Sequence, residues 1–157
     1  MHTNHKQFME RALSLASESV TRGTGPFGAV VVRDGVVIAE AWNQVTELND
    51  PTAHAEIQAI RAACKTLGTF HLGDCILYTS SHPCPMCHGA IEWARISNAY
   101  YANTLDAAAA VGFDDIHMYH DLCSPEYEWG AKLEHLVVAG AEKPFKEWQR
   151  NPRKVPY

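Results

Sequence analysis

Two cysteines separated by two residues, Cys84 and Cys87, constrain the fold of this chain more than any other feature. Pro83 precedes them, and at this spacing both side chains lie on one face of the first turn of a helix. His54 and Glu56 stand upstream in a separate segment. Three protein ligands are one fewer than a closed structural zinc site uses, which leaves a coordination position for water. The combined pattern predicts a catalytic zinc centre with Glu56 as its proton carrier.

Each half of this pattern is ambiguous when taken alone. With nine histidines and 18 acidic residues, about one His-x-Glu match is expected by chance. A Cys-x-x-Cys pair is also typical of thiol redox proteins, which would not need His54 and Glu56. A structural zinc site is disfavoured, because no second pair of cysteines or histidines has ligand spacing. The remaining cysteines are predicted to be core residues: Cys64, Cys75 and Cys123.

Composition favours one domain over residues 1–157 and argues against a nucleic-acid binder. The chain has 157 residues, of which 46% are apolar, so it can bury a core without disulfides. Five cysteines, an odd number, favour a reducing, cytoplasmic location. We expect no signal peptide and no membrane span. The net charge of −5 differs from the basic surface of most nucleic-acid binders. The basic residues near the C-terminus are interpreted as a solvated or docking tail: Lys143, Lys146, Arg150, Arg153 and Lys154.

The apolar pattern predicts helices that alternate with strands. Asp34-Gly35 between two β-branched runs indicates a tight hairpin and an antiparallel first pair. The alternation that follows implies parallel pairing, with helices on both faces of one α/β sheet. A polar loop is expected over residues 43–50, and the signal weakens beyond Gly112. The expected helices cover residues 4–22, 51–67, 84–95, 106–111 and 144–150, and the expected strands cover 27–32, 36–42, 75–79, 98–102 and 133–138.

The combined motif resembles the H-x-E…P-C-x-x-C signature of the zinc-dependent cytidine deaminase superfamily. The likeness runs from about residue 6 to the C-terminus. It implies a three-layer α/β/α fold with a mixed five-stranded sheet. It also implies one zinc ion per subunit, held by His54, Cys84 and Cys87. The implied reaction is hydrolytic deamination, in which Glu56 acts first as base and then as acid.

Several stretches are similar to the bacterial guanine deaminase branch of this superfamily. The tRNA adenosine deaminase branch shares the zinc signature, but the acidic charge favours a free base over tRNA. The expected reaction is therefore the conversion of guanine to xanthine and ammonia. Another aminated heterocycle (guanosine, cytosine, a pterin or a triazine) and an inactive zinc-binding module stay open as alternatives. The similar stretches are Gly25–Ala29, Asn49–Glu56, Pro83–Cys87, Ala94–Arg95, Gly112–Asp115 and the terminal Tyr157.

The resemblance to guanine deaminases also implies substrate contacts. Asn43 would read the edge of the base, while Phe27 and Trp93 would pack on its ring. Asp115 would hydrogen-bond the amidine and help to carry protons, and Ala55 belongs to the same implied substrate site. On the residues alone, the two aromatic rings are equally compatible with core packing, Asn43 with a turn and Asp115 with a helix cap.

The same resemblance implies a homodimer in which C-terminal segments, about residues 140–157, are exchanged. Tyr157 would then cap the bound base and exclude water, although a frayed end is an equal alternative. The sequence departs from the family at three positions near the cysteines. His82 replaces a glutamate, His88 replaces a small or apolar residue, and Glu92 replaces an aromatic residue. These departures leave the exact base open.

Overall fold

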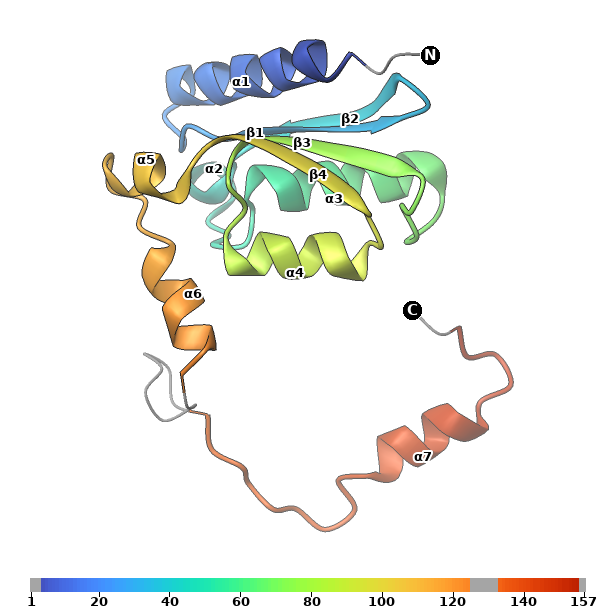
Figure 1. Cartoon of the computed structure of the whole chain (residues 1–157). Helices are drawn as coiled ribbons and strands as arrows, with labels where there is room; N and C mark the ends of the chain where they lie inside the picture. Colours follow the sequence, from blue (N-terminus) through green and yellow to red (C-terminus); the bar gives the residue numbers. More distant parts are fainter. Residues whose placement is uncertain (1–3, 125–132, 156–157) are drawn as a thin grey trace. The chain divides into compact units, whose positions relative to one another are not determined.

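The computed structural model of the chain describes residues 4–124 and 133–155 (Figure 1). The chain divides into two compact units, unit 1 over Met1–Tyr119 and unit 2 over His120–Tyr157. Unit 2 contains the predicted C-terminal helix, α7 (Lys143–Arg150). The single-domain organisation stays a prediction. Within the described ranges, no helix is both long and apolar enough to cross a membrane.

Unit 1 is built on a sheet of four strands in the order β2-β1-β3-β4. The central strand β1 is antiparallel to β2 and β3, whereas β3 and β4 are parallel, so the sheet is mixed as expected. The predicted hairpin is confirmed, because Asp34 and Gly35 have positive φ angles of 52° and 77°. The strands are β1 (Gly28–Arg33), β2 (Val36–Trp42), β3 (Cys75–Ser81) and β4 (Asn98–Asn103).

The fifth strand is absent from the described residues. The segment predicted to form it, residues 133–138, has no regular secondary structure, and its side chains are exposed. An apolar, β-branched run forms a strand only where a neighbouring strand satisfies its main-chain groups. The segment belongs to unit 2, which contains no strand in its described part. The outer strand β4 is exposed along its length.

Helices cover both faces of the sheet (Figure 1). Helix α1 (His5–Thr21) packs on one face, where Phe8 contacts Val30 and Tyr78 in one apolar cluster. Helices α3 (Ala55–Leu67) and α4 (Pro85–Trp93) cover the other face, where Val31 and Leu77 are buried. Consecutive strand residues point to opposite faces, so one apolar run on β1 supplies both cores. The predicted three-layer α/β arrangement is thereby confirmed.

Several predicted boundaries were wrong. Helix α3 begins at Ala55 because the Asp50 carboxylate accepts hydrogen bonds from the Thr52 amide and hydroxyl, which fold residues 50–52 into a turn. The predicted polar loop contains a short helix, α2 (Val45–Leu48). Helix α5 (Leu105–Ala109) was expected, but α6 (Ile116–Leu122), which crosses from unit 1 into unit 2, was not.

The cysteines are all free thiols, but they are not all core residues. Cys75 is buried and Cys64 is partly buried, as the prediction required. Cys123 is exposed, so its assignment to the core was wrong. It lies in unit 2, where every residue of the described part from 133 to 150 is exposed and no apolar core surrounds the thiol.

Candidate metal centre and active-site cavity

The N-termini of α3 and α4 supply the predicted metal ligands. His54 is the N-cap of α3 and Cys84 is the N-cap of α4, and both have an extended main chain. Pro85 occupies the first helical position, where a missing N–H group costs nothing. Cys87 lies in the same first turn and therefore on the same side of α4 as Cys84. The N-termini of α3 and α4 thus bring all three predicted ligands together.

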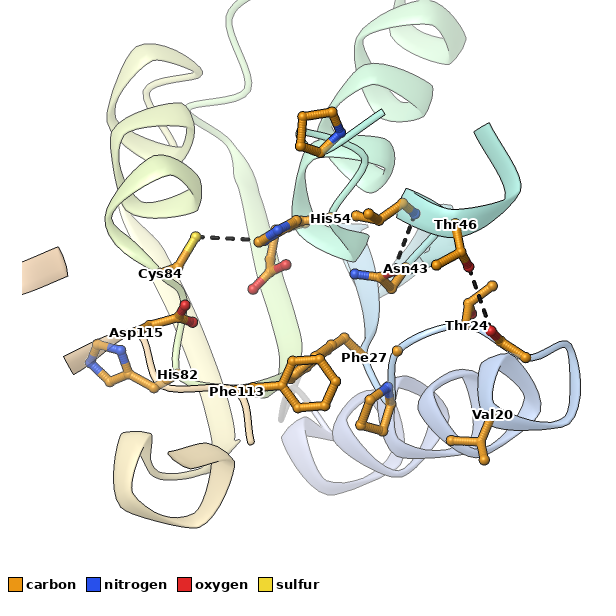
Figure 2. A pocket seen from close by; sticks show the side chains of 16 residues that line it. Val20, Thr24, Phe27, Asn43, Thr46, His54, His82, Cys84, Phe113 and Asp115 are labelled. Carbon is orange, nitrogen blue, oxygen red and sulfur yellow. Dashed lines mark hydrogen bonds between the residues drawn. The ribbon is translucent and has the colours of Figure 1, made fainter. Parts of the chain in front are cut away.

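The three ligand atoms form a compact cluster. The Sγ atoms of Cys84 and Cys87 lie 3.6 Å and 3.5 Å from Nδ1 of His54. All three ligand atoms lie within 4.8 Å of one another, and Figure 2 shows the approach of Cys84 to His54. Both cysteines are buried. Two thiolates and one imidazole are a donor set typical of catalytic zinc, so the residues fit the expected ion.

The electrostatics of the two thiols also fit a cation site. A hydrogen bond from Cys87, followed by one from His54, lowers the pKa of Cys84 to about 4. The hydrogen bond with Cys84 and burial raise the pKa of Cys87. Under the influence of the protein's own side chains, Cys84 and Cys87 together therefore carry one negative charge at neutral pH. A divalent cation is the partner that stabilises both thiolates at once.

Glu56 lies beside the ligand cluster as a buried carboxylate. It is 6% exposed. Its Oε1 accepts a hydrogen bond of 3.1 Å from the Thr79 hydroxyl, and its Oε2 lies 3.5 Å from Sγ of Cys87. Burial raises the pKa of Glu56, which brings the carboxylate closer to the range in which it can both take and return a proton.

A cavity of about 660 Å³ opens onto this cluster within unit 1 (Figure 2). His54, Glu56 and Cys84 line one side of it, and the rings of Phe27 and Phe113 line another. The two rings meet edge to face with centroids 4.9 Å apart. The volume falls in the range of small-molecule sites, and the wall combines an aromatic edge with a few polar groups.

Asn43 and Asp115 complete the polar part of the wall. Oδ1 of Asn43 accepts a 3.2 Å hydrogen bond from the Val45 amide, and its Nδ2 points into the cavity in Figure 2. Asp115 lines the cavity beside Cys84. Burial and the nearby Cys84 thiolate raise the pKa of the Asp115 carboxyl. Both side chains can therefore meet a bound ligand.

Other predicted residues lie elsewhere. Trp93, the last residue of α4, is 63% exposed and does not line the cavity. Ala55 is fully buried between His54 and Glu56 and has no surface on the cavity wall. Tyr157 lies outside the described residues. The substrate roles assigned to these three residues stay predictions.

The three departures from the family pattern separate in space. His88 and Glu92 lie one turn apart on the exposed face of α4, 3.9 Å from each other, and neither lines the cavity. His82 does line it. Within unit 1, His82 is therefore the one of the three departures that can influence which ligand fits.

Sequence reasoning missed two parts of the site. Phe113 was noted only as part of a family stretch, although its ring forms a wall with Phe27. Thr79, the hydrogen-bond partner of Glu56, lies on β3 at a position where the apolar strand pattern gave no signal. Both depend on contacts between segments far apart in the sequence.

Comparisons with known proteins agree with this geometry. Residues 2–103 match the family model of the cytidine and deoxycytidylate deaminase zinc-binding region. The chain is 49% identical to guanine deaminase of Bacillus subtilis over 155 residues, which cover 98% of this chain and 99% of that protein. The X-ray structure of guanine deaminase from Bacillus subtilis matches with a TM-score of 0.95 over 98% of this chain and 99% of that chain. A tRNA-specific adenosine deaminase of Agrobacterium fabrum is 51% identical over 94 residues, which cover 60% of this chain and 62% of that protein.

Proposed function

Because the chain belongs to the zinc-binding cytidine and deoxycytidylate deaminase family, we propose that it is a hydrolase that converts guanine to xanthine and ammonia. One observation carries this proposal: the buried Glu56 carboxylate and the metal ligands His54 and Cys84 line one cavity of about 660 Å³, with Cys87 directly behind them. Such a cavity suits one small heterocycle. Likeness to a guanine deaminase along nearly the full chain supports guanine as that heterocycle.

The ligands and the proton carrier divide the chemistry between them. His54, Cys84 and Cys87 would hold zinc, which would supply a Lewis acid that lowers the pKa of the attacking water. Glu56 takes a proton from the attacking water. Glu56 passes this proton to a ring nitrogen as the C2–O bond forms. It then takes the second proton, from the new hydroxyl, and gives it to the exocyclic amine, which leaves as ammonia when the C2–N bond breaks. Thr79 holds Oε1 of Glu56, so Oε2 lies on the side of the metal ligands, 3.5 Å from Sγ of Cys87.

The remaining wall residues would orient the base. The Nδ2 donor of Asn43 would read an acceptor on the base edge, since Oδ1 is already bonded to the Val45 amide. The ring of Phe27, braced by Phe113, would lie against the flat face or edge of the purine. Asp115 would accept hydrogen bonds from the amidine and help to carry protons away. The aromatic and polar groups thus select a planar base with donors and acceptors on its rim.

A base within tRNA is the main alternative substrate. The acidic net charge of −5 and the shorter match to a tRNA-specific adenosine deaminase both weaken it. A homodimer with exchanged C-terminal segments, closure by Tyr157 and a cytoplasmic location stay predictions from the sequence.

An ammonia-release screen of the purified, zinc-loaded protein tests the proposal. The substrates are guanine, guanosine, adenine, cytosine, cytidine, ammeline and a tRNA anticodon hairpin. We expect ammonia from guanine, together with the ultraviolet spectrum of xanthine. Release from the hairpin alone would overturn the guanine assignment, and release from none of them would favour a zinc-binding module without activity.

A further inference from the structure

The carbonyl oxygen of Pro83, directly before the metal ligand Cys84, accepts two side-chain hydrogen bonds. The hydroxyl of Tyr119 donates one, at 2.7 Å. Nδ1 of His82 lies 2.9 Å from the same oxygen. A carbonyl can only accept, so Nδ1 of His82 carries its proton here. The residue before the metal ligand is therefore held from two directions.

Tyr119 also belongs to the segment that forms one wall of the cavity. Asp115 directly precedes α6, and its carbonyl oxygen accepts hydrogen bonds from the Met118 and Tyr119 amides at 3.2 Å and 3.4 Å. These bonds join the Asp115 main chain to the first turn of α6, so Tyr119 lies one turn after Asp115. A displacement of Tyr119 would therefore also displace the main chain that carries the Asp115 carboxylate.

Two groups of contacts hold residues 113–119 against the rest of unit 1. At one end, the Phe113 ring meets Phe27. At the other end, Tyr119 bonds Pro83 and packs edge to face on His82, with ring centroids 5.7 Å apart. Asp115 lies between these anchors, on the side of the cavity where Cys84 lies in Figure 2. The two anchors hold the carboxylate near the ligand cluster.

We propose that Tyr119 is a positioning residue, whose hydroxyl ties α6 to the Pro83 carbonyl and thereby holds the Asp115 carboxylate beside the metal ligands. This inference rests on the proposed deamination of guanine. His82 supports the arrangement by packing on the Tyr119 ring and by sharing the same carbonyl. Tyr119 itself does not line the cavity, so it acts through Asp115 and not on the base.

A double-mutant cycle tests this role. The variants are Tyr119→Phe, Asp115→Asn and the double substitution, each zinc-loaded and assayed for deamination of guanine. We expect Tyr119→Phe to lower kcat/KM about tenfold, the size of one lost hydrogen bond, with unchanged zinc content. In the Asp115→Asn background, Tyr119→Phe should not lower kcat/KM any further. Additive losses, or no loss in Tyr119→Phe, would overturn the proposal.

Tyr101→Phe is the matched control. Tyr101 also packs edge to face on His82, with centroids 4.7 Å apart, but it is not a partner of the Pro83 carbonyl. We expect wild-type kcat/KM in this variant. A loss equal to that of Tyr119→Phe would show that the effect does not depend on the hydrogen bond to the Pro83 carbonyl, and would overturn the proposal.

A measurement without turnover separates this inference from the proposed function. In Tyr119→Phe, hydrogen exchange should be faster at the main-chain amides of residues 118 and 119. In Tyr101→Phe, exchange at these two amides should be unchanged. Unchanged exchange at these amides in Tyr119→Phe would contradict the anchor, whatever the activity. If wild-type protein releases no ammonia from guanine, the proposed function fails, while the exchange result still decides whether Tyr119 holds α6.

Discussion

The carboxylate of Glu56 lies 3.5 Å from the thiol of Cys87, although the two residues belong to different helices. Strand β3 separates these helices in the sequence and supplies Thr79, which binds the other carboxylate oxygen. Glu56 is therefore next to the ligand cluster without belonging to it. A hydrolytic zinc site requires a carboxylate that is separate from the metal ligands in this way, and we propose that Glu56 carries the proton.

The role of Glu56 predicts the outcome of Glu56→Gln. The amide keeps the shape of the side chain and an oxygen for the Thr79 hydroxyl, but it cannot accept a proton. We expect wild-type zinc content, measured by elemental analysis, and a fall in kcat of about 10²- to 10⁴-fold. Glu92→Gln, on the exposed face of α4, is the control and should retain full activity. Full activity in Glu56→Gln would refute the mechanism.

Asn43→Asp tests the proposed contact between Asn43 and the base. The carboxylate still provides an acceptor for the Val45 amide, so the turn and the melting temperature should be preserved. The Nδ2 donor that points into the cavity is lost, and a negative charge replaces it. We expect kcat/KM for guanine to fall at least about 10- to 100-fold. Gln44→Glu, a neighbouring amide outside the cavity lining, is the control, and an equal loss in both variants would contradict a specific contact.

Gly28→Ala tests the packing of α1 on the sheet. A Cβ atom at residue 28 would overlap the Ala12 carbonyl oxygen and would lie 2.6 Å from the Ala16 amide nitrogen, so the helix must shift. We expect a loss of about 1–3 kcal/mol in the free energy of unfolding, measured by urea denaturation. Gly89→Ala, in α4 with open space around it, should instead gain about 0.5–1 kcal/mol. Equal stability of the two variants would contradict the close contact.

The raised pKa of the Cys75 thiol predicts that the protein loses stability in alkaline solution. Burial, followed by the charge of Asp74, raises the pKa of this thiol from 9.0 to about 11. Between about pH 9 and pH 11 the unfolded thiol ionises while the folded one does not. Its contribution is therefore complete below pH 9 and falls as the pH rises, by about 1–3 kcal/mol in total.

Comparison with Cys75→Ala isolates this effect from other groups that titrate at high pH. The cavity left by the smaller side chain lowers stability by the same amount at every pH. The difference in unfolding free energy between wild type and variant should therefore shrink from about pH 8 to about pH 11. A difference that stays constant across this range would show that the folded thiol ionises normally.

The sequence could not tell which of the three departures, His82, His88 and Glu92, lies at the cavity. All three lie near the cysteines in the chain, so all three raised the same question about the substrate. Only the fold separates them: α4 turns His88 and Glu92 away from the cavity, while His82 lies on its wall and packs on Tyr119. Residues close in the sequence need not lie at the same site, because the residues of a helix such as α4 point in different directions around its axis.

The sequence by itself determined the ligand set, the hairpin and the alternation of helices with strands, and it singled out Glu56, the carboxylate beside the ligands. These features depend on local spacing and on the turn chemistry of a few residues, such as Asp34 and Gly35. Tertiary structure alone decided that Thr79 orients Glu56, that Phe113 braces Phe27 and that Tyr119 reaches Pro83. It also decided that residues 133–138 form no strand. Those outcomes depend on which distant segments meet, and no local pattern encodes such a meeting.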